Sequence, residues 1–517
     1  MTTPGSASAP VPAATGRRAP VDLPGPLGDS SILRESMWFE FGVGDDEPPV
    51  PAWALRAEPS MDAHVPPPPL SAGLPDGKRR PLPLGTAALL ERASYPDGRV
   101  AGAPALLDRI GTALVASFGV QWHDPANPYN VHRCYASPRC LYPVQVFLDD
   151  GERWNLLDLE RHTLVEMPGA AHGPCSRRRL ALTGRYTRIP RGYKWFRGSL
   201  VNMELGIMLR SLSIGLELVG LSSLLRLPDA RSHDLLTQLG LDPTSDFSLP
   251  LIVELGAGEP EPTTAAPQRP SSDHPPDEVL ADIVRINRVQ DFREPPAPLG
   301  TGIPADAASP SSPMSWAELL WQRNSGRTLR GMRGMSGKRH RLPGAAVRDM
   351  CRWLSVPPPG PTLAAVGAAV TLTVVLQAVD GHTDGIYRVR DGEITVYTED
   401  PTAARRLEVE YGYPLTPNSA CDIRHASAIW FLTVRPRELA ALFGPGGWSA
   451  AQYVSGWAVH GLCLSACAAG LFARPVRAFN EIPTQRILGL EPDEMIALAA
   501  VVGTPRHTSG SLLDIRL

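Results

Sequence analysis

The sequence predicts an α+β fold in which one structural unit occurs twice, the two copies packing as a pseudo-dimer within a single chain. Residues 142–164 (YPVQVFLDDGERWNLLDLERHTL) predict strand, turn and strand, and the long apolar segment 199–221 follows them. Residues 371–394 repeat this pattern, and they precede the glycine-containing, small-residue-rich segment 442–476. The shared order of elements indicates a tandem duplication.

Composition and charge set broad limits on the function. The chain has 517 residues, of which 43% are hydrophobic, enough for two or three domains. A formal net charge of -3 gives no electrostatic case for nucleic acid as a partner. Seven cysteines at irregular spacings, and a segment 1–30 without the apolar core of a signal peptide, predict free thiols, no metal site and a cytoplasmic location.

The longest apolar segment runs from Ser199 to Leu227. It is long enough to span a membrane, but it contains two glutamates and two arginines. It therefore predicts a long buried helix of a soluble protein, with no membrane partner.

Proline-rich stretches divide the chain. Residues 1–84 predict a mostly disordered region, and residues 256–313 predict a linker rich in Pro, Ser and acidic residues. Within the linker, LADIVRINRVQDF could form a short helix. The two repeats are expected at 85–255 and 314–517.

The segment WQRNSGRTLRG, residues 321–331, places arginines around a serine after an apolar helical turn. A solvated basic loop is the simplest explanation of such a segment. A phosphate site is the alternative, because forked guanidinium groups form paired charge-assisted hydrogen bonds with a phosphate and a serine hydroxyl can add another. Arg323, Ser325 and Arg327 are the candidate ligands.

These residues carry a family resemblance. The Arg323, Ser325 and Arg327 pattern resembles the phosphate motif of the nitroreductase superfamily, whose members are flavin-binding α+β dimers. The first repeat is similar to the SagB, or thiazole/oxazole (azoline) dehydrogenase, branch of that superfamily. The similarity lies in the loop ASPRCLYPVQVFL at 136–148 and in the Arg-Gly-Tyr turn at 191–193. The resemblance extends over about residues 85–230 and 315–505.

The resemblance implies an FMN site shared between two tandem nitroreductase-like domains. It implies that the phosphate motif of the second repeat holds the FMN phosphate and that Ser137, Pro138 and Arg139 of the first repeat approach the flavin ring. The reciprocal pieces are lost, because residues 355–367 lack the serine loop and no phosphate motif precedes residue 115. One flavin per chain is therefore expected.

The same resemblance implies an FMN-dependent dehydrogenase that oxidises thiazoline or oxazoline rings to azoles in a ribosomally made peptide, alongside a cyclodehydratase. The family's Lys-Tyr pair is replaced by Thr187 and Arg188. Tyr186, Tyr193 and Lys194 are the candidate substitutes for its base, although Tyr193 and Lys194 could simply pack and cap the following helix. An NAD(P)H-dependent nitro- or ene-reductase and a non-catalytic scaffold of a heterocycle-forming complex are the alternatives, and further homo-oligomerisation stays open.

Overall fold

We analysed a computed structural model of the chain. It describes residues 64–74, 78–100, 105–123, 131–168, 178–242, 246–256, 278–310, 312–326, 339–411, 423–505 and 513–514. The α-helices are α2 (Thr86–Glu91), α3 (Leu106–Phe118), α4 (Phe196–Leu218), α5 (Ser232–Gln238), α6 (Glu278–Asn287), α7 (Trp316–Gln322), α8 (Gly344–Leu354), α9 (Pro361–Ala368), α10 (Ala403–Val409), α11 (Pro436–Phe443), α12 (Gly447–Ala468) and α13 (Glu481–Leu488). The short 3-10 helices are η4 (Leu70–Gly73), η5 (Pro138–Cys140), η6 (Tyr186–Arg188), η7 (Arg191–Tyr193), η8 (Ile423–His425) and η9 (Gly444–Gly446).

The first repeat is built on an antiparallel sheet of order β1-β6-β5-β4-β7-β9-β8-β10. Its strands are β1 (Arg79–Pro81), β4 (Val144–Asp149), β5 (Trp154–Asp158), β6 (Thr163–Glu166), β7 (Arg178–Gly184), β8 (Ser223–Arg226), β9 (Leu251–Leu255) and β10 (Ala297–Pro298). Every residue of β9 is buried, which explains why its sequence LIVEL is almost continuously apolar. A small separate sheet joins β2 (Val120–His123) to β3 (His132–Arg133) and β17 (Leu513–Asp514).

The second repeat has a six-stranded antiparallel sheet of order β13-β12-β11-β14-β16-β15. Its strands are β11 (Thr371–Leu376), β12 (Gly385–Arg390), β13 (Glu393–Glu399), β14 (Ala428–Val434), β15 (Phe472–Val476) and β16 (Met495–Gly503). The order reproduces β6-β5-β4-β7-β9-β8 of the first repeat strand for strand. Each long helix, α4 or α12, follows the fourth strand of its set, so the predicted duplication of one α+β unit is confirmed.

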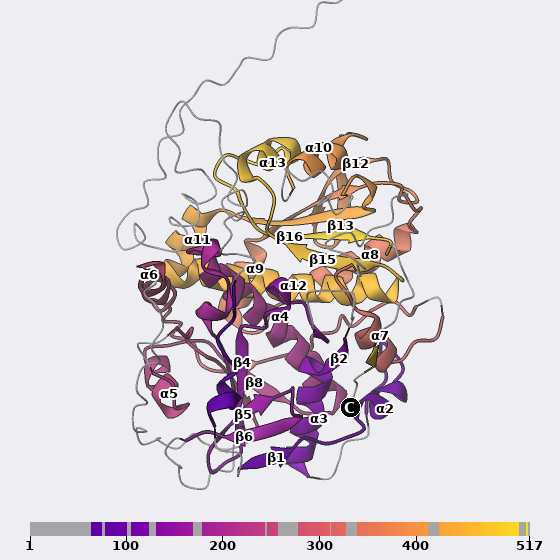
Figure 1. Ribbon diagram of the computed structural model, residues 1–517. Helices are drawn as coiled ribbons and strands as arrows, with labels where there is room; N and C mark the ends of the chain where they lie inside the picture. The colour runs from indigo at the N-terminus through magenta and orange to yellow at the C-terminus, as the bar shows by residue number, and fades with distance from the viewer. Residues whose placement is uncertain are drawn as a thin grey trace, which may run out of the picture.

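The two long helices lie side by side between the two sheets (Figure 1). Nearly all residues of both helices are buried, because each packs on its own sheet and on the other helix. The contact is reciprocal. A Cβ on Gly206 would lie 2.0 Å from the Tyr453 carbonyl oxygen, and one on Gly456 would lie 2.1 Å from that of Met203. Gly206 thus contacts Tyr453 in the same way as Gly456 contacts Met203, as in a twofold-symmetric interface.

Polar side chains repeat this reciprocity. The Asn202 amide donates to Ser449 Oγ at 3.2 Å, and the Gln452 amide donates to Ser199 Oγ. Asn202 also donates to Gln452 Oε1 at 2.9 Å. All four side chains are buried, so the hydrogen bonds between the helices satisfy groups that water does not reach.

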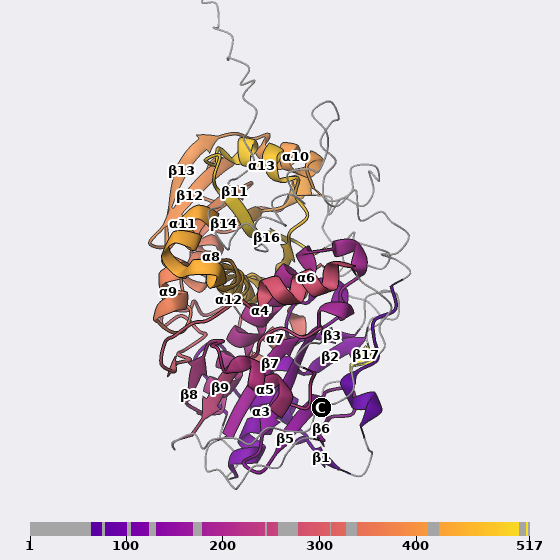
Figure 2. The same cartoon turned by 90° about the vertical axis from the view of Figure 1, so that its left-hand side faces the viewer.

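The predicted linker is more ordered than its composition suggests. The expected short helix forms as α6, which packs against α4 (Figure 2). Phe292, Leu299 and Ile303 are buried, and β10 pairs with β8. Apolar anchors spaced through a proline-rich segment are enough to fix it on a preformed surface.

The described part of the proline-rich N-terminal region is also ordered, since β1 pairs with β6 and residues 64–74 lie against the first repeat. The expectation of disorder for residues 1–63 falls outside the described residues. Among the described helices, none is long and apolar enough to cross a membrane. The predicted long helix is α4, which ends at Leu218 before β8.

The helix contact predicts a steric cost for any side chain at Gly206. Gly206→Ala places a methyl group against a backbone carbonyl that cannot rotate away, so we expect a loss of about 3 kcal/mol of unfolding free energy. Thermal and urea unfolding measure it. Gly73→Ala is the control because its added Cβ has no atom within 4 Å. Equal stability of the two variants would contradict the close approach of α4 and α12.

Candidate functional site

Arg323 ends helix α7 at the boundary between the repeats. The helix begins at a capping box of Ser315 and Glu318 and docks through a buried Trp316. The Arg323 side chain is only 3% exposed, and its Nη2 donates to the Arg133 carbonyl oxygen of β3 at 3.0 Å. Its Nε and Nη1 are buried and have no hydrogen-bond partner within the described residues. A buried guanidinium with two unsatisfied donors is costly, so the arrangement suits a bound anion.

The next residues of the motif are held by an arginine that sequence reasoning missed. Arg474 of β15 donates to the Ser325 carbonyl oxygen. The Arg474 Nη2 atom also lies 3.4 Å from the Gly326 carbonyl oxygen. Arg474 is 8% exposed. An arginine inside a buried strand was the available signal, although only the fold shows what it contacts. Arg327 lies outside the described residues.

The loop from Ser137 to Tyr142 has an unusual backbone. Arg139, Cys140 and Tyr142 have φ values of 53°, 54° and 48°, in the left-handed region that residues other than glycine rarely adopt. Ser137 stabilises this shape, because its Oγ accepts from the Tyr142 amide at 2.9 Å and donates to the Glu204 carboxyl group. The Ser137 side chain therefore points to α4, and Pro138 and Arg139 form the outer part of the loop.

Glu204 is a fully buried carboxyl group in the middle of α4. Besides Ser137, it accepts from the Val144 amide at 3.4 Å. Burial raises its pKa to about 8, against the opposing effects of these hydrogen bonds and of the Arg133 and Arg188 charges. Sequence analysis used Glu204 only as evidence against a membrane span, since its partner lies 67 residues away along the chain.

The structure brings the two predicted halves of the site together. Helix α7 docks on β2, where the Trp122 indole donates to the Trp321 carbonyl oxygen at 3.3 Å. Arg323 then reaches Arg133, which lies four residues before Ser137. Segments about 190 residues apart are thus in contact, as the composite site requires.

His460 of α12 adds a second buried group with unsatisfied atoms. Both its ring nitrogens are buried without a hydrogen-bond partner among the described residues. Burial holds its pKa well below the usual range, and the Arg210 and Arg323 charges lower it further, so the imidazole is neutral. Sequence analysis did not single it out, because a histidine on a small-residue helix is ordinary until its neighbours are known.

The equivalent position in the other helix is occupied differently. Arg210 stands four residues after Gly206, as His460 stands four residues after Gly456. The Arg210 guanidinium donates to the carbonyl oxygens of Gly302, Trp457 and Trp353 at 2.9, 3.0 and 2.9 Å. Its nitrogens are satisfied by the protein, so this position offers no donor to a ligand.

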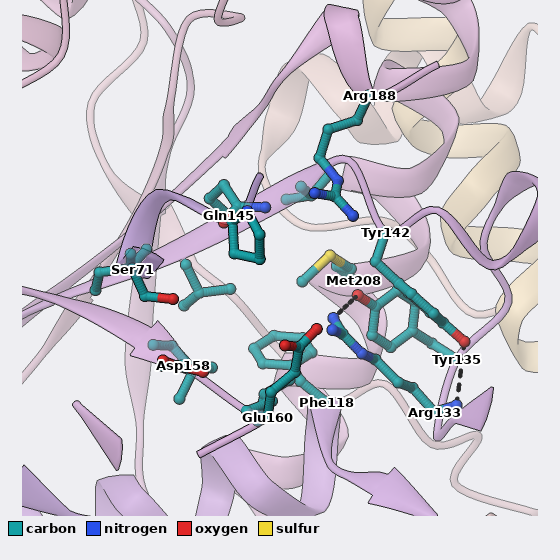
Figure 3. A pocket seen from close by; sticks show the side chains of 16 residues that line it. Ser71, Phe118, Arg133, Tyr135, Tyr142, Gln145, Asp158, Glu160, Arg188 and Met208 are labelled. Carbon is teal, nitrogen blue, oxygen red and sulfur yellow. Dashed lines mark hydrogen bonds between the residues drawn. The ribbon is translucent and has the colours of Figure 1, made fainter. Parts of the chain in front are cut away.

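A cavity lies on the first-repeat side of the loop (Figure 3). Its volume is about 60 Å³, enough for a few water molecules. In this view Arg188 points into it from above, and Arg133 and Glu160 point into it from below. The lining also includes Pro69 and Ser71 from the N-terminal segment.

The three candidate catalytic residues lie around the turn that enters α4. Tyr186 is fully buried in the core, its hydroxyl has no partner within the described residues, and burial raises its pKa. The Tyr193 ring lies 6.2 Å from that of Phe196. Lys194 has a φ of 44° and its carbonyl oxygen accepts from Arg197 Nε at 3.0 Å. The Tyr193–Lys194 turn thus lies directly before α4, whose N-terminus has no side-chain cap.

Comparison with known proteins places the fold. No family model matches the sequence, and no curated protein matches it. A solved nitroreductase-like protein of Anabaena variabilis is 14% identical, with a TM-score of 0.57 over 78% of this chain and 90% of that one. The chain has a nitroreductase fold. Because neither repeat alone makes up 78% of the chain, the similarity extends over both repeats.

Two other solved structures are less similar. The Escherichia coli microcin synthetase McbBCD complex with truncated pro-MccB17 gives 11% identity and a TM-score of 0.28, covering 33% of this chain and 66% of that one. A nitroreductase-like protein from Exiguobacterium sibiricum in complex with FMN gives 12% identity and a TM-score of 0.25, covering 38% and 91%. Overall similarity at this level does not bear on the function of this chain.

The buried carboxyl group of Glu204 predicts a pH-dependent stability. Because its pKa is higher in the folded chain than its ordinary value of 4.5, the folded state retains a proton that the unfolded state releases between pH 4.5 and about 8. Its contribution is therefore full below pH 4.5 and is lost as pH rises to about 8, by on the order of a few kcal/mol.

Thermal unfolding at pH 5 and pH 8.5 measures this effect in the wild type and in Glu204→Gln. The amide stays neutral throughout, so the variant should lose less stability than the wild type over this range. Parallel pH profiles would show that Glu204 does not retain its proton on folding.

Proposed function

We propose that the chain is an FMN-dependent oxidoreductase with one flavin site, formed by both repeats. The observation that carries the proposal is the Arg323 guanidinium beside the loop of the opposite repeat, because two of its buried donors have no partner in the part of the chain that the structure describes. A phosphate supplies the acceptors and the negative charge that such a group lacks. Ser325 and Arg327 would complete the phosphate contacts, and Arg474 holds the backbone of the motif.

The remaining residues fit the other end of an FMN molecule. Pro138 and Arg139 form the outer part of a loop whose shape the buried Ser137–Glu204 pair maintains. FMN, when bound, accepts a hydride from the substrate. The chain positions the loop, excludes water with the buried α4–α12 contact, and offers the neutral His460 as a polar neighbour.

The substrate that fits the resemblance is a thiazoline or oxazoline ring in a modified peptide, supplied by a cyclodehydratase. Support comes from the 136–148 loop and the 191–193 turn, which resemble azoline dehydrogenases. A base must remove the ring-carbon proton. Tyr193 and Lys194 are the proposed sources, since Tyr186 is enclosed in the core. An NAD(P)H-dependent nitro- or ene-reductase is the second candidate within the same fold, and a scaffold role would leave the chain without bound flavin.

Arg323→Ala tests the phosphate contact. Losing a paired contact to a buried phosphate costs about 2–4 kcal/mol, so we expect FMN affinity to fall at least 30-fold and the folded variant to purify colourless. Flavin absorbance and equilibrium titration measure this, with the exposed Arg231→Ala as control. The wild-type titration should saturate at one FMN per chain. A ratio of two, or full occupancy in Arg323→Ala, would contradict the composite site.

Tyr193→Phe and Lys194→Ala test the base. If one of these side chains removes the proton, its variant should keep FMN while azoline oxidation slows by roughly 100-fold. Product formation by mass spectrometry and flavin absorbance provide the two readouts. Tyr186→Phe is the control buried in the core. Wild-type rates in both test variants would limit the turn to its structural role.

A further inference from the structure

Residues 64–74, here called the strap, are held on the first repeat by arginines. Arg188 Nη1 donates to the Pro67 carbonyl oxygen at 3.2 Å, and Arg185 Nη1 donates to that of Pro68 at 3.3 Å. Arg79 Nη2 makes a longer contact, 3.4 Å, with the Ser71 carbonyl oxygen. The described strap contacts are thus made largely to main-chain carbonyl groups, which any extended peptide presents.

Arg188 connects the strap to the loop of the proposed flavin site. Its Nε donates to the Leu141 carbonyl oxygen at 2.9 Å, while its own carbonyl oxygen lies 3.0 Å from His64 Nε2. Burial lowers the pKa of His64, and the charges of Arg139, Arg188 and Arg197 lower it further. The first residue of the strap therefore lies in a strongly positive environment beside the loop.

The strap does not fill the space beneath it. The cavity of about 60 Å³ has Pro69 and Ser71 on its strap side and Arg133, Arg188 and Glu160 on the protein side (Figure 3). The C-terminal end of the strap packs against the sheet, where Leu74 is buried and Leu70 lies beside it. The N-terminal part does not, since Val65 is 85% exposed, and it is held by the arginine contacts. The surface under the strap, here called the groove, combines arginine donors for carbonyl groups with apolar residues of the sheet.

We propose that this groove receives an extended stretch of the substrate peptide and that the strap occupies it in cis. The identity of the ligand as the substrate peptide depends on the function proposed above. The evidence for the groove itself is the set of arginine contacts. A proline-rich segment suits this role, because it is extended without internal hydrogen bonds and presents carbonyl groups without competing N–H donors. The arginines around His64 favour an acidic side chain at that position of the substrate.

A tethered segment competes strongly with a free peptide. Its effective concentration is in the millimolar range, so the strap lowers the apparent affinity for any peptide that binds the same groove. Loosening the strap should therefore raise peptide affinity without any new contact. Pro67→Gly together with Pro68→Gly increases the freedom of the unbound segment and removes its preference for the extended form.

The experiment measures binding of a fluorescein-labelled peptide, HVPPPPLSAGL, to the full chain by fluorescence anisotropy. The double glycine variant should bind it about tenfold more tightly than the wild type. A peptide with Asp in place of the histidine should bind the variant more tightly still. The all-D peptide of the same sequence should not bind, because its carbonyl groups cannot meet the arginines in register.

Adding Arg188→Ala to the double glycine variant should abolish the gain, with Arg231→Ala as the exposed control. Arg188→Lys, which keeps the charge and loses the fork, should lose most of the gain and covers the case in which the alanine variant does not fold. Equal peptide affinity in wild type and glycine variant, or equal binding of the D-peptide, would overturn the proposal.

The binding measurement needs neither flavin nor turnover. Peptide binding without azoline oxidation would leave the groove standing and refute the proposed reaction. Azoline oxidation whose KM is unchanged by loosening the strap, together with unchanged anisotropy, would refute the groove and leave the reaction standing.

Discussion

The contact between α4 and α12 determines the geometry on which every other feature depends. Gly206 and Gly456 let each helix approach the backbone of the other, and the amide and hydroxyl groups of Asn202, Ser449 and their counterparts fix the register. Both helices are therefore buried on all sides, which requires a sheet beyond each of them (Figure 1). The same contact sets the distance at which α7 of one repeat meets β3 of the other.

The two equivalent positions in the symmetric pair of helices, 210 in α4 and 460 in α12, carry different side chains. Arg210 brings a charge into one position, where its guanidinium donates to three carbonyl oxygens of the protein. His460 brings a neutral ring into the other, and two donors of the neighbouring Arg323 have no partner among the residues that the structure describes. The difference lies in the hydrogen-bond balance of each position and not in its backbone. In the position without a proposed phosphate motif, the protein's own carbonyl groups thus occupy the arginine.

Sequence analysis succeeded where one local pattern determines the outcome. The strand–turn–strand periodicities and the long apolar helices depend on neighbouring residues, and they appear in both repeats. It missed Arg474 and His460, because their importance arises from segments distant in the chain. It also underestimated the order of residues 278–310, where burial of Phe292 depends on a surface formed elsewhere. The expectation that Arg323 lies beside the first repeat came from the resemblance to nitroreductase dimers, and no periodicity could have supplied it.

Arg188 is a departure from the pattern of the resembled family. It stands where the resembled azoline dehydrogenases carry one member of their Lys-Tyr pair, and its side chain binds two carbonyl groups, those of Leu141 and Pro67. A phenol offers one donor, whereas a guanidinium offers five in a fixed fork, so only the arginine can hold the loop and the strap together. The residue that stands at this position of the resemblance therefore fastens the proline-rich strap beside the loop. In the function proposed above, the base comes from the neighbouring turn, and a peptide that reaches the loop along the proposed groove displaces the strap.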